Sequence, residues 1–128
     1  MGKPICALLL LMLALPAYGA DRPKREKEGK AFYALLSADV ALTAADLVTS
    51  QMAYRRGGHE VWMPYWYGYQ PHAPRQAVQM FGEVILFESV AYLADRTNHH
   101  RLARLVQAAR VGAQGSAVAM NAVCLGRH

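Results

Sequence analysis

The stretch FYALLSADVALTAADLVTSQMAY, which runs from Phe32 to Tyr54, decides the fold. If it forms a helix, its polar residues recur at spacings of four, three and four, which places them in one narrow stripe. Most other positions hold Ala, Val, Leu or Met, whereas a surface helix of a soluble protein has an apolar stripe roughly 100° wide. This inverted pattern predicts a helix with apolar surroundings and a polar seam that faces partner helices. The stripe consists of Asp39, Thr43, Asp46 and Ser50.

The composition leaves a membrane protein and a soluble protein both open. The chain has 128 residues, of which 54% are hydrophobic and 18% are charged, against roughly 25% charged residues in an ordinary soluble domain. The mean hydropathy of +0.05 is nevertheless low for a protein with several membrane spans. This length provides one modest core and no second domain.

The first residues have the three parts of a secretory signal peptide, which we expect at residues 1–19. Lys3 is the basic start, residues 5–15 are the apolar run, and residues 17–19 are a small-x-small cleavage site. The alternative is an uncleaved anchor, although the run is short for a span of ~20 residues. After cleavage Cys124 would be the single cysteine, so we expect no internal disulfide.

A charged segment, residues 20–30, follows the leader. It has no apolar side chain from Asp21 to Lys30, so we expect a flexible, solvated tether. The alternative is a basic patch on anionic lipid headgroups, where each cation contributes ~1 kcal/mol. No aromatic residue is interleaved with these charges, so we expect no nucleic-acid binding despite the net charge of +5.

The rest of the chain predicts an all-α fold, an antiparallel three-helix bundle within residues 31–124 that is membrane-embedded. The glycines at 57 and 58 favour a helix stop, and Thr97-Asn98 form the next break. Residues 57–74 are rich in Trp, Tyr and Pro, which indicates an ordered loop at a membrane interface or, alternatively, a lid over a soluble bundle. The expected helices are 31–54, 75–96 and 102–124, with a tail at 125–128.

Short segments over most of the chain after the leader form a distinctive pattern. They are Asp46 with Thr49, Gly57-Gly58 followed by Glu60 and Pro64, Tyr92-Leu93, the run Arg96 to Leu105, and Asn121. In these segments the chain resembles a group of small bacterial envelope proteins with a leader and three apolar helices. The group usually has Asn-Pro after the glycines, whereas this chain has Trp62-Met63-Pro64. The resemblance implies a membrane-embedded helical protein and no known activity.

In an up-down-up bundle, the position of each polar residue along the bundle axis indicates which residues of the other helices lie at the same level. Arg110 lies at about the level of Asp39, while Asp46 and Glu83 both lie slightly to the loop side of their helix midpoints. A carboxylate within an apolar layer costs ~2.5–3.5 kcal/mol, so such groups are usually paired. The expected buried polar network is Asp39, Asp46, Gln79, Glu83, Arg110, Gln114 and Asn121.

Two interpretations of this network remain open. In the first, an ion pair of Asp39 with Arg110 and a proton-sharing pair of Asp46 with Glu83 only fix the packing. In the second, the Asp46–Glu83 pair is a proton or cation site, because two carboxyls in contact cannot both ionise cheaply. Three helices are too few to enclose a path, so such a conductor would be an oligomer.

The remaining histidines and hydroxyls provide no catalytic motif. We expect no enzyme activity and no cofactor, because the chain has no Ser-His-acid spacing, phosphate-binding glycine loop or di-iron motif. His99 and His100 are expected to form a cationic start of the last helix. A metal site near the aromatic loop is a weaker alternative that matches no known spacing; its candidate zinc or copper ligands are His59, Glu60, His72, Cys124 and His128.

Together these patterns favour an accessory or structural subunit of the inner membrane. Its expected partners are membrane lipid and either another membrane protein or a second copy of itself. The alternatives are a soluble periplasmic helical module that binds a small ligand or metal, and an oligomeric proton or cation conductor.

Overall fold

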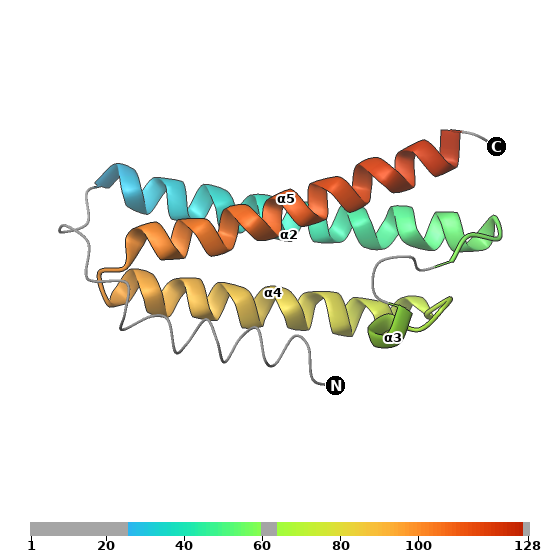
Figure 1. The fold of residues 1–128 in the computed structure, drawn as a ribbon, viewed down its shortest axis with the longest axis horizontal. Helices are drawn as coiled ribbons and strands as arrows, with labels where there is room; N and C mark the ends of the chain where they lie inside the picture. The colour runs from blue at the N-terminus through green and yellow to red at the C-terminus, as the bar shows by residue number, and fades with distance from the viewer. Residues whose placement is uncertain (1–25, 60–63, 127–128) are drawn as a thin grey trace.

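A computed structural model of the chain describes residues 26–59 and 64–126, and within these ranges the regular structure is all helix. Three long helices pack against one another as an antiparallel bundle (Figure 1). The predicted three-helix bundle is therefore confirmed. A fourth, short helix lies in the connection between the first two long ones. The helices are α2 (Glu26–Arg55), α3 (Pro64–Tyr67), α4 (Ala73–Arg96) and α5 (His100–Gly126).

The helix limits differ from the predicted ones mainly at the start of α2. The predicted tether is wrong for residues 26–30, because these residues form the first turns of α2. Glu and Lys are strong helix formers, which explains why the helix continues into the charged segment. The signal peptide expected at residues 1–19, and the tether up to residue 25, lie outside the described residues.

The turns that end α2 and α4 use the same hydrogen-bond pattern. After α2, Gly57 adopts a positive φ of 89°, and the Gly58 N–H donates to the Ala53 carbonyl at 3.0 Å. After α4, Asn98 takes a φ of 62°, and the His99 N–H donates to the Ala94 carbonyl at 2.8 Å. Both are the left-handed cap that satisfies the last carbonyls of a helix.

The bundle has two ends, which we name the first end and the loop end. The first end holds the start of α2, the end of α4 and the start of α5 (Figure 1). The loop end holds the end of α2, α3, the start of α4 and the end of α5. From the first end to the loop end, α5 crosses in front of α2 and diverges from α4 in the view of Figure 1.

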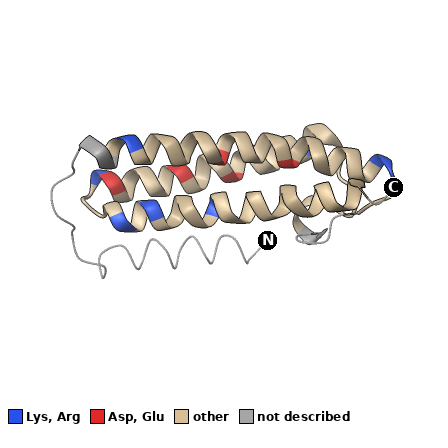
Figure 2. Ribbon diagram, turned by 90° about the horizontal axis from the view of Figure 1, so that it is seen from above, with Lys and Arg blue, Asp and Glu red and all other residues tan. Residues whose placement is uncertain are grey.

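Apolar packing is concentrated at the first end. Phe32 of α2, Ala91 and Ala94 of α4, and Leu102 and Val106 of α5 belong to one buried cluster there. Farther along the bundle, the buried side chains are largely polar, and many large apolar side chains are exposed. Figure 2 shows Lys and Arg gathered mostly toward the two ends of the helices. The buried polar or charged side chains include Asp39, Thr43, Asp46, Ser50, Gln76, Glu88, Gln107, Arg110 and Gln114.

Candidate functional site

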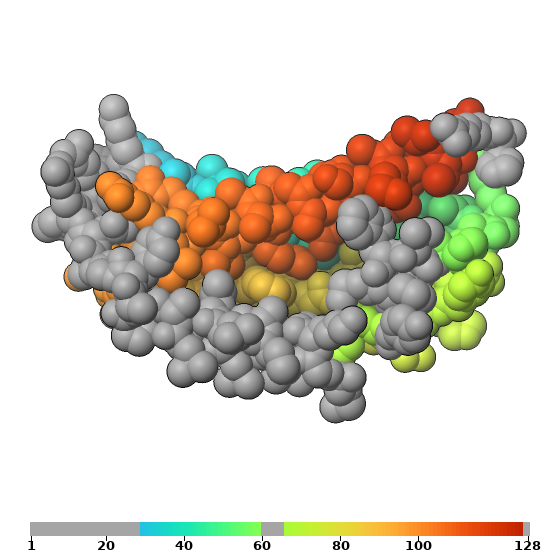
Figure 3. All heavy atoms as spheres, in the orientation of Figure 1, coloured from blue at the N-terminus to red at the C-terminus, as the bar shows by residue number. Residues whose placement is uncertain are grey.

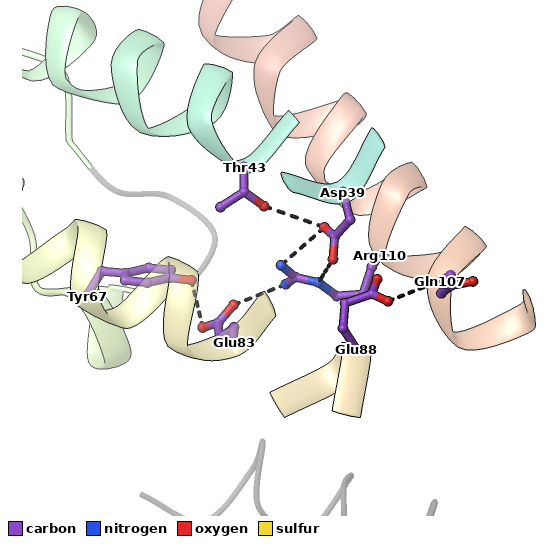
Figure 4. Close-up of polar contacts among 7 residues, drawn as sticks. All are labelled: Asp39, Thr43, Tyr67, Glu83, Glu88, Gln107 and Arg110. Carbon is purple, nitrogen blue, oxygen red and sulfur yellow. Dashed lines mark hydrogen bonds and ion pairs between the residues drawn. The ribbon is translucent and has the colours of Figure 1, made fainter. Parts of the chain in front are cut away.

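Arg110 of α5 joins all three long helices at the middle of the bundle (Figure 4). Its Nε donates to Asp39 Oδ2 at 3.4 Å, and its Nη2 lies 3.4 Å from Asp39 Oδ1. Its Nη1 donates to Glu83 Oε2 at 3.2 Å. Asp39 is 0% exposed, so this is a buried ion pair of the kind that is costly to break by removing one partner.

Neutral groups and a third carboxyl surround this ion pair. The Tyr67 hydroxyl of α3 donates to Glu83 Oε1 at 2.7 Å, and the Gln107 amide donates to Glu88 Oε2 at 2.7 Å. The Glu88 carboxyl lies beside Asp39 and Arg110 and interacts with both electrostatically (Figure 4). We call Asp39, Glu83, Glu88 and Arg110 the carboxyl cluster.

Asn121 of α5 forms a second polar group nearer the loop end. Its Nδ2 lies 2.9 Å from Asp46 Oδ1, 3.1 Å from Thr49 Oγ1 and 3.0 Å from Ser50 Oγ. The Ser50 hydroxyl also donates to Asp46 Oδ1 at 3.1 Å. These contacts fix the second half of α5 to α2, in the region where α5 has separated from α4.

Amide side chains position the loop end. Gln51 of α2 donates to the Gln76 side chain at 2.7 Å and to the Pro71 carbonyl at 2.9 Å. Gln79 of α4 donates to the Trp66 carbonyl at 2.7 Å. These bonds hold α3 and the connection against the bundle, and so present the Tyr67 hydroxyl to Glu83.

A partly open cavity of about 300 Å³ lies between α4 and α5 on the loop side of Arg110. Figure 3 shows the face of the molecule on which α5 and α4 separate toward the loop end. The polar wall of the cavity includes Asp46, Glu83, Arg110 and Gln114, and its apolar wall includes Met80 and Ala117. The Gln114 Oε1 atom is buried and has no hydrogen-bond partner.

The residues of the predicted network lie in separate sets of contacts, and one of the two predicted pairs is present. Asp39 and Arg110 form the expected ion pair. The predicted contact between Asp46 and Glu83 is wrong: Glu83 accepts from Tyr67 and Arg110, and Asp46 accepts from Ser50 and Asn121. The two carboxyls instead line one cavity. Their separation arises because the guanidinium provides a better partner for Glu83 than a second acid.

Of the predicted metal ligands, the three that the structure describes, His59, His72 and Cys124, do not form a group that could hold a metal ion. His59 stacks on Tyr69 with ring centroids 4.6 Å apart, while His72 and Cys124 are exposed. Glu60 and His128 lie outside the described residues. Within the ranges that the structure describes, no group of three or more His, Cys, Asp or Glu side chains is placed to hold a metal ion.

His100 begins α5, as predicted, and its side chain is buried. Its Nδ1 lies 2.7 Å from Asp95 Oδ1 at the first end. The helix cap at Asn98 turns the chain back, so that the first residue of α5 meets the last turn of α4.

Sequence reasoning missed the roles of Glu88, Gln107, Gln76 and Tyr67. Gln107 precedes Arg110 by three residues, which places both on one face of α5. Glu88 comes five residues after Glu83, about 140° away around the helix, so that spacing did not indicate its position beside the ion pair. The role of Tyr67 depends on the position of α3, which no periodic pattern in the connection reveals. Neither a protein-family model, nor a curated protein, nor a solved structure matches this chain.

Proposed function

We propose that this chain is an integral membrane protein of the cell envelope that acts as an accessory or structural subunit. One observation carries the proposal: beyond the first end most of the buried side chains are polar, and many large apolar side chains lie on the outside of the bundle. A soluble bundle has the reverse distribution, because water drives apolar groups inward. Lipid removes that drive and favours buried, mutually bonded polar groups.

Two helices are long and apolar enough to cross a bilayer, Gly29–Arg55 and Ala73–Arg96. The core helix of a soluble protein would meet the same criterion, but it would be mostly buried. Here only 22% of the most apolar 18-residue stretch of Gly29–Arg55 is buried, and only 33% of that of Ala73–Arg96. Exposed apolar residues within these helices include Val48 and Ile85, which are 58% and 68% exposed.

The charged residues of α4 leave a span of suitable length between them. Arg75 and Arg96 are exposed at its ends. Of the three acids between them, Glu83 and Glu88 belong to the carboxyl cluster, and Asp95, next to Arg96, pairs with His100. Twenty-one residues of helix rise ~30 Å, which is the thickness of a bilayer hydrocarbon core.

The exposed serines of the three long helices satisfy their hydroxyls within their own helix. Ser37, Ser89 and Ser116 each donate to the carbonyl four residues earlier, at 2.8, 2.6 and 2.8 Å. Such bonds leave no hydroxyl without an acceptor where water is absent.

A subunit role is supported by the surface of α5. Gly112 and Ser116 are exposed, and a Cβ added at Gly112 would meet nothing within 4 Å. Gly115 lies toward α2, where its added Cβ would be 4.0 Å from Leu42. The outward small residues suit contact with a helix of another membrane protein or of a second copy.

A pair of lysine substitutions tests the membrane proposal. Ile85 is exposed at the middle of α4, and Leu93 is exposed one turn from its end. In a bilayer, Ile85→Lys costs ~2.5–3.5 kcal/mol of insertion, whereas the lysine of Leu93→Lys extends to the interface. We expect Ile85→Lys to lower the amount of protein that stays in the membrane pellet after carbonate washing, and Leu93→Lys to leave it unchanged.

Each other outcome contradicts the proposal. Wild-type protein that leaves the pellet in carbonate, or an Ile85→Lys variant that behaves as Leu93→Lys does, would favour the soluble periplasmic module that binds a small ligand. On a soluble bundle, both exposed positions tolerate lysine within about ±0.5 kcal/mol.

A second candidate function, an oligomeric proton or cation conductor, is favoured by the two carboxyls that line the cavity, Asp46 and Glu83. Oligomerisation would have to close the open side between α4 and α5. Proton flux into vesicles that contain the purified protein tests it, since Glu83→Gln should lower that flux. Unchanged flux in this variant would remove the conductor from consideration.

A further inference from the structure

We propose that the cavity between α4 and α5 binds a primary ammonium group, whose N–H donors Glu83 and Gln114 accept. The ammonium site extends the proposed membrane role but does not depend on it, since the same groups face the cavity whether or not the bundle spans a bilayer.

The carboxyl cluster contains more acid than base. Asp39, Glu83 and Glu88 surround Arg110, which gives three carboxyls for one guanidinium. An excess of buried negative charge is costly unless a cation or a proton compensates it. Glu83 is the carboxyl of this cluster that lines the cavity. Asp46 and Arg110 line it as well, so two carboxyls face the cavity for one guanidinium, and a cation placed there is attracted on balance.

Gln114 independently indicates a ligand that carries N–H donors. The side chain lines the cavity and is only 7% exposed, and its Oε1 has no hydrogen-bond partner. Buried amide oxygens in proteins nearly always accept a hydrogen bond. An ammonium group in the cavity would supply this donor and would also compensate the excess of carboxyls.

The size and walls of the cavity limit the ligand to a small amine. Its volume of about 300 Å³ is at the lower end for small-molecule sites, which start at ~300 Å³. Met80, Ala113 and Ala117 form an apolar wall that suits a short alkyl chain. The ligand class is therefore a primary alkylammonium, either as a free amine or as the headgroup of an amino lipid.

Calorimetric titration of the full chain in maltoside micelles with n-butylammonium chloride tests the site. Potassium chloride and sodium butyrate at equal ionic strength are the controls for charge and for the alkyl chain. We expect saturable binding of butylammonium alone. Glu83→Gln and Gln114→Met should each weaken it by about tenfold or more, since each removes an acceptor for a charged donor.

Gln70→Met is the matched control, because Gln70 is exposed at the loop end and donates to the Gly58 carbonyl outside the cavity. This variant should bind butylammonium as the wild type does. If Glu83→Gln does not fold, Gln114→Met decides, since it changes no charge. Equal binding by Gln114→Met and wild type, or equal heats from butylammonium and potassium, would overturn the proposal.

Nanodiscs distinguish the two sources of the amine. If the natural ligand is a lipid headgroup, phosphatidylethanolamine nanodiscs should weaken butylammonium binding by competition relative to phosphatidylcholine nanodiscs. If it is a free amine, the two lipids should give equal binding. Either result supports the ammonium site, whereas an absence of butylammonium binding in micelles and in both nanodiscs contradicts it. Carbonate extraction tests the membrane proposal by itself, so a failure of the ammonium site can be distinguished from a failure of the membrane proposal.

Discussion

Arg110→Gln is the substitution from which we expect the largest loss of stability. The guanidinium holds Asp39 of α2 and Glu83 of α4, and it lies over the Phe87 ring at 5.4 Å from the centroid. Glutamine is neutral and too short to bond both carboxyls. It would leave Asp39, which is 0% exposed, beside two further acids with no cation. Breaking a buried pair in this way costs ~3–5 kcal/mol.

The opposite substitution, Asp39→Asn, should cost less because the cluster has an excess of carboxyls. Arg110 would keep its bond to Glu83 and its interaction with Glu88. The loss is then one hydrogen bond to a charged group, ~1.5–3 kcal/mol. The double variant should cost less than the sum of the single variants, because each single variant leaves a charge that the double variant lacks.

Reversible unfolding in mixed maltoside and dodecyl sulfate micelles, followed by far-ultraviolet circular dichroism, measures these differences. Ser37→Ala serves as control, since it removes only an exposed hydroxyl that bonds its own helix. The critical result is the difference between the loss of stability in Arg110→Gln and the loss in Asp39→Asn. If Asp39→Asn destabilises the bundle as much as Arg110→Gln, the three carboxyls do not depend on this one guanidinium, and the charge argument for the ammonium site fails with it.

Three further substitutions test other parts of the bundle by the same unfolding measurement. Asn121→Leu should cost ~1–3 kcal/mol because it removes the amide donor to Asp46 that fixes α5 to α2; a loss below 0.5 kcal/mol would contradict this role. Tyr67→Phe should cost ~1.5–3 kcal/mol, since Glu83 loses its shortest hydrogen bond; no loss would mean that α3 does not hold that carboxyl. Gly57→Ala should cost ~1–2 kcal/mol, because alanine must adopt the φ of 89°; an equally stable variant would show that the cap rearranges freely.

The helices were predictable because their limits depend on local chemistry. The glycines at 57 and 58 and the break at Thr97-Asn98 mark real helix ends, and the polar stripe of Phe32 to Tyr54 faces the interior. The ion pair of Asp39 with Arg110 was also predictable, since depth along straight antiparallel helices follows from residue number. These features need only the helix period and the helix rise.

The partners of Glu83 were not predictable by the same reasoning. Residue number gives depth but not rotation about the helix axis or the separation of neighbouring helices, and α5 diverges from α4 beyond Arg110. Asp46 and Glu83 therefore share a cavity rather than a contact. The Tyr67 bond to Glu83 depends on how α3 folds back, which tertiary hydrogen bonds from Gln51 and Gln79 decide.

The distribution of polar groups also explains why α5 does not meet the hydropathy criterion for a span although it packs with two helices that do. Hydropathy averages over all faces of a helix, and the polar residues Gln107, Arg110, Gln114 and Asn121 face the interior or the cavity. An isolated α5 would carry Arg110 into lipid at a cost of ~2.5–3.5 kcal/mol, which Asp39 and Glu83 offset only after the helices have packed. In the proposed membrane, α2 and α4 therefore have the hydropathy of spans, and α5 is stable there only as part of the bundle. The carboxyl cluster thus links the insertion of one helix to the packing of all three.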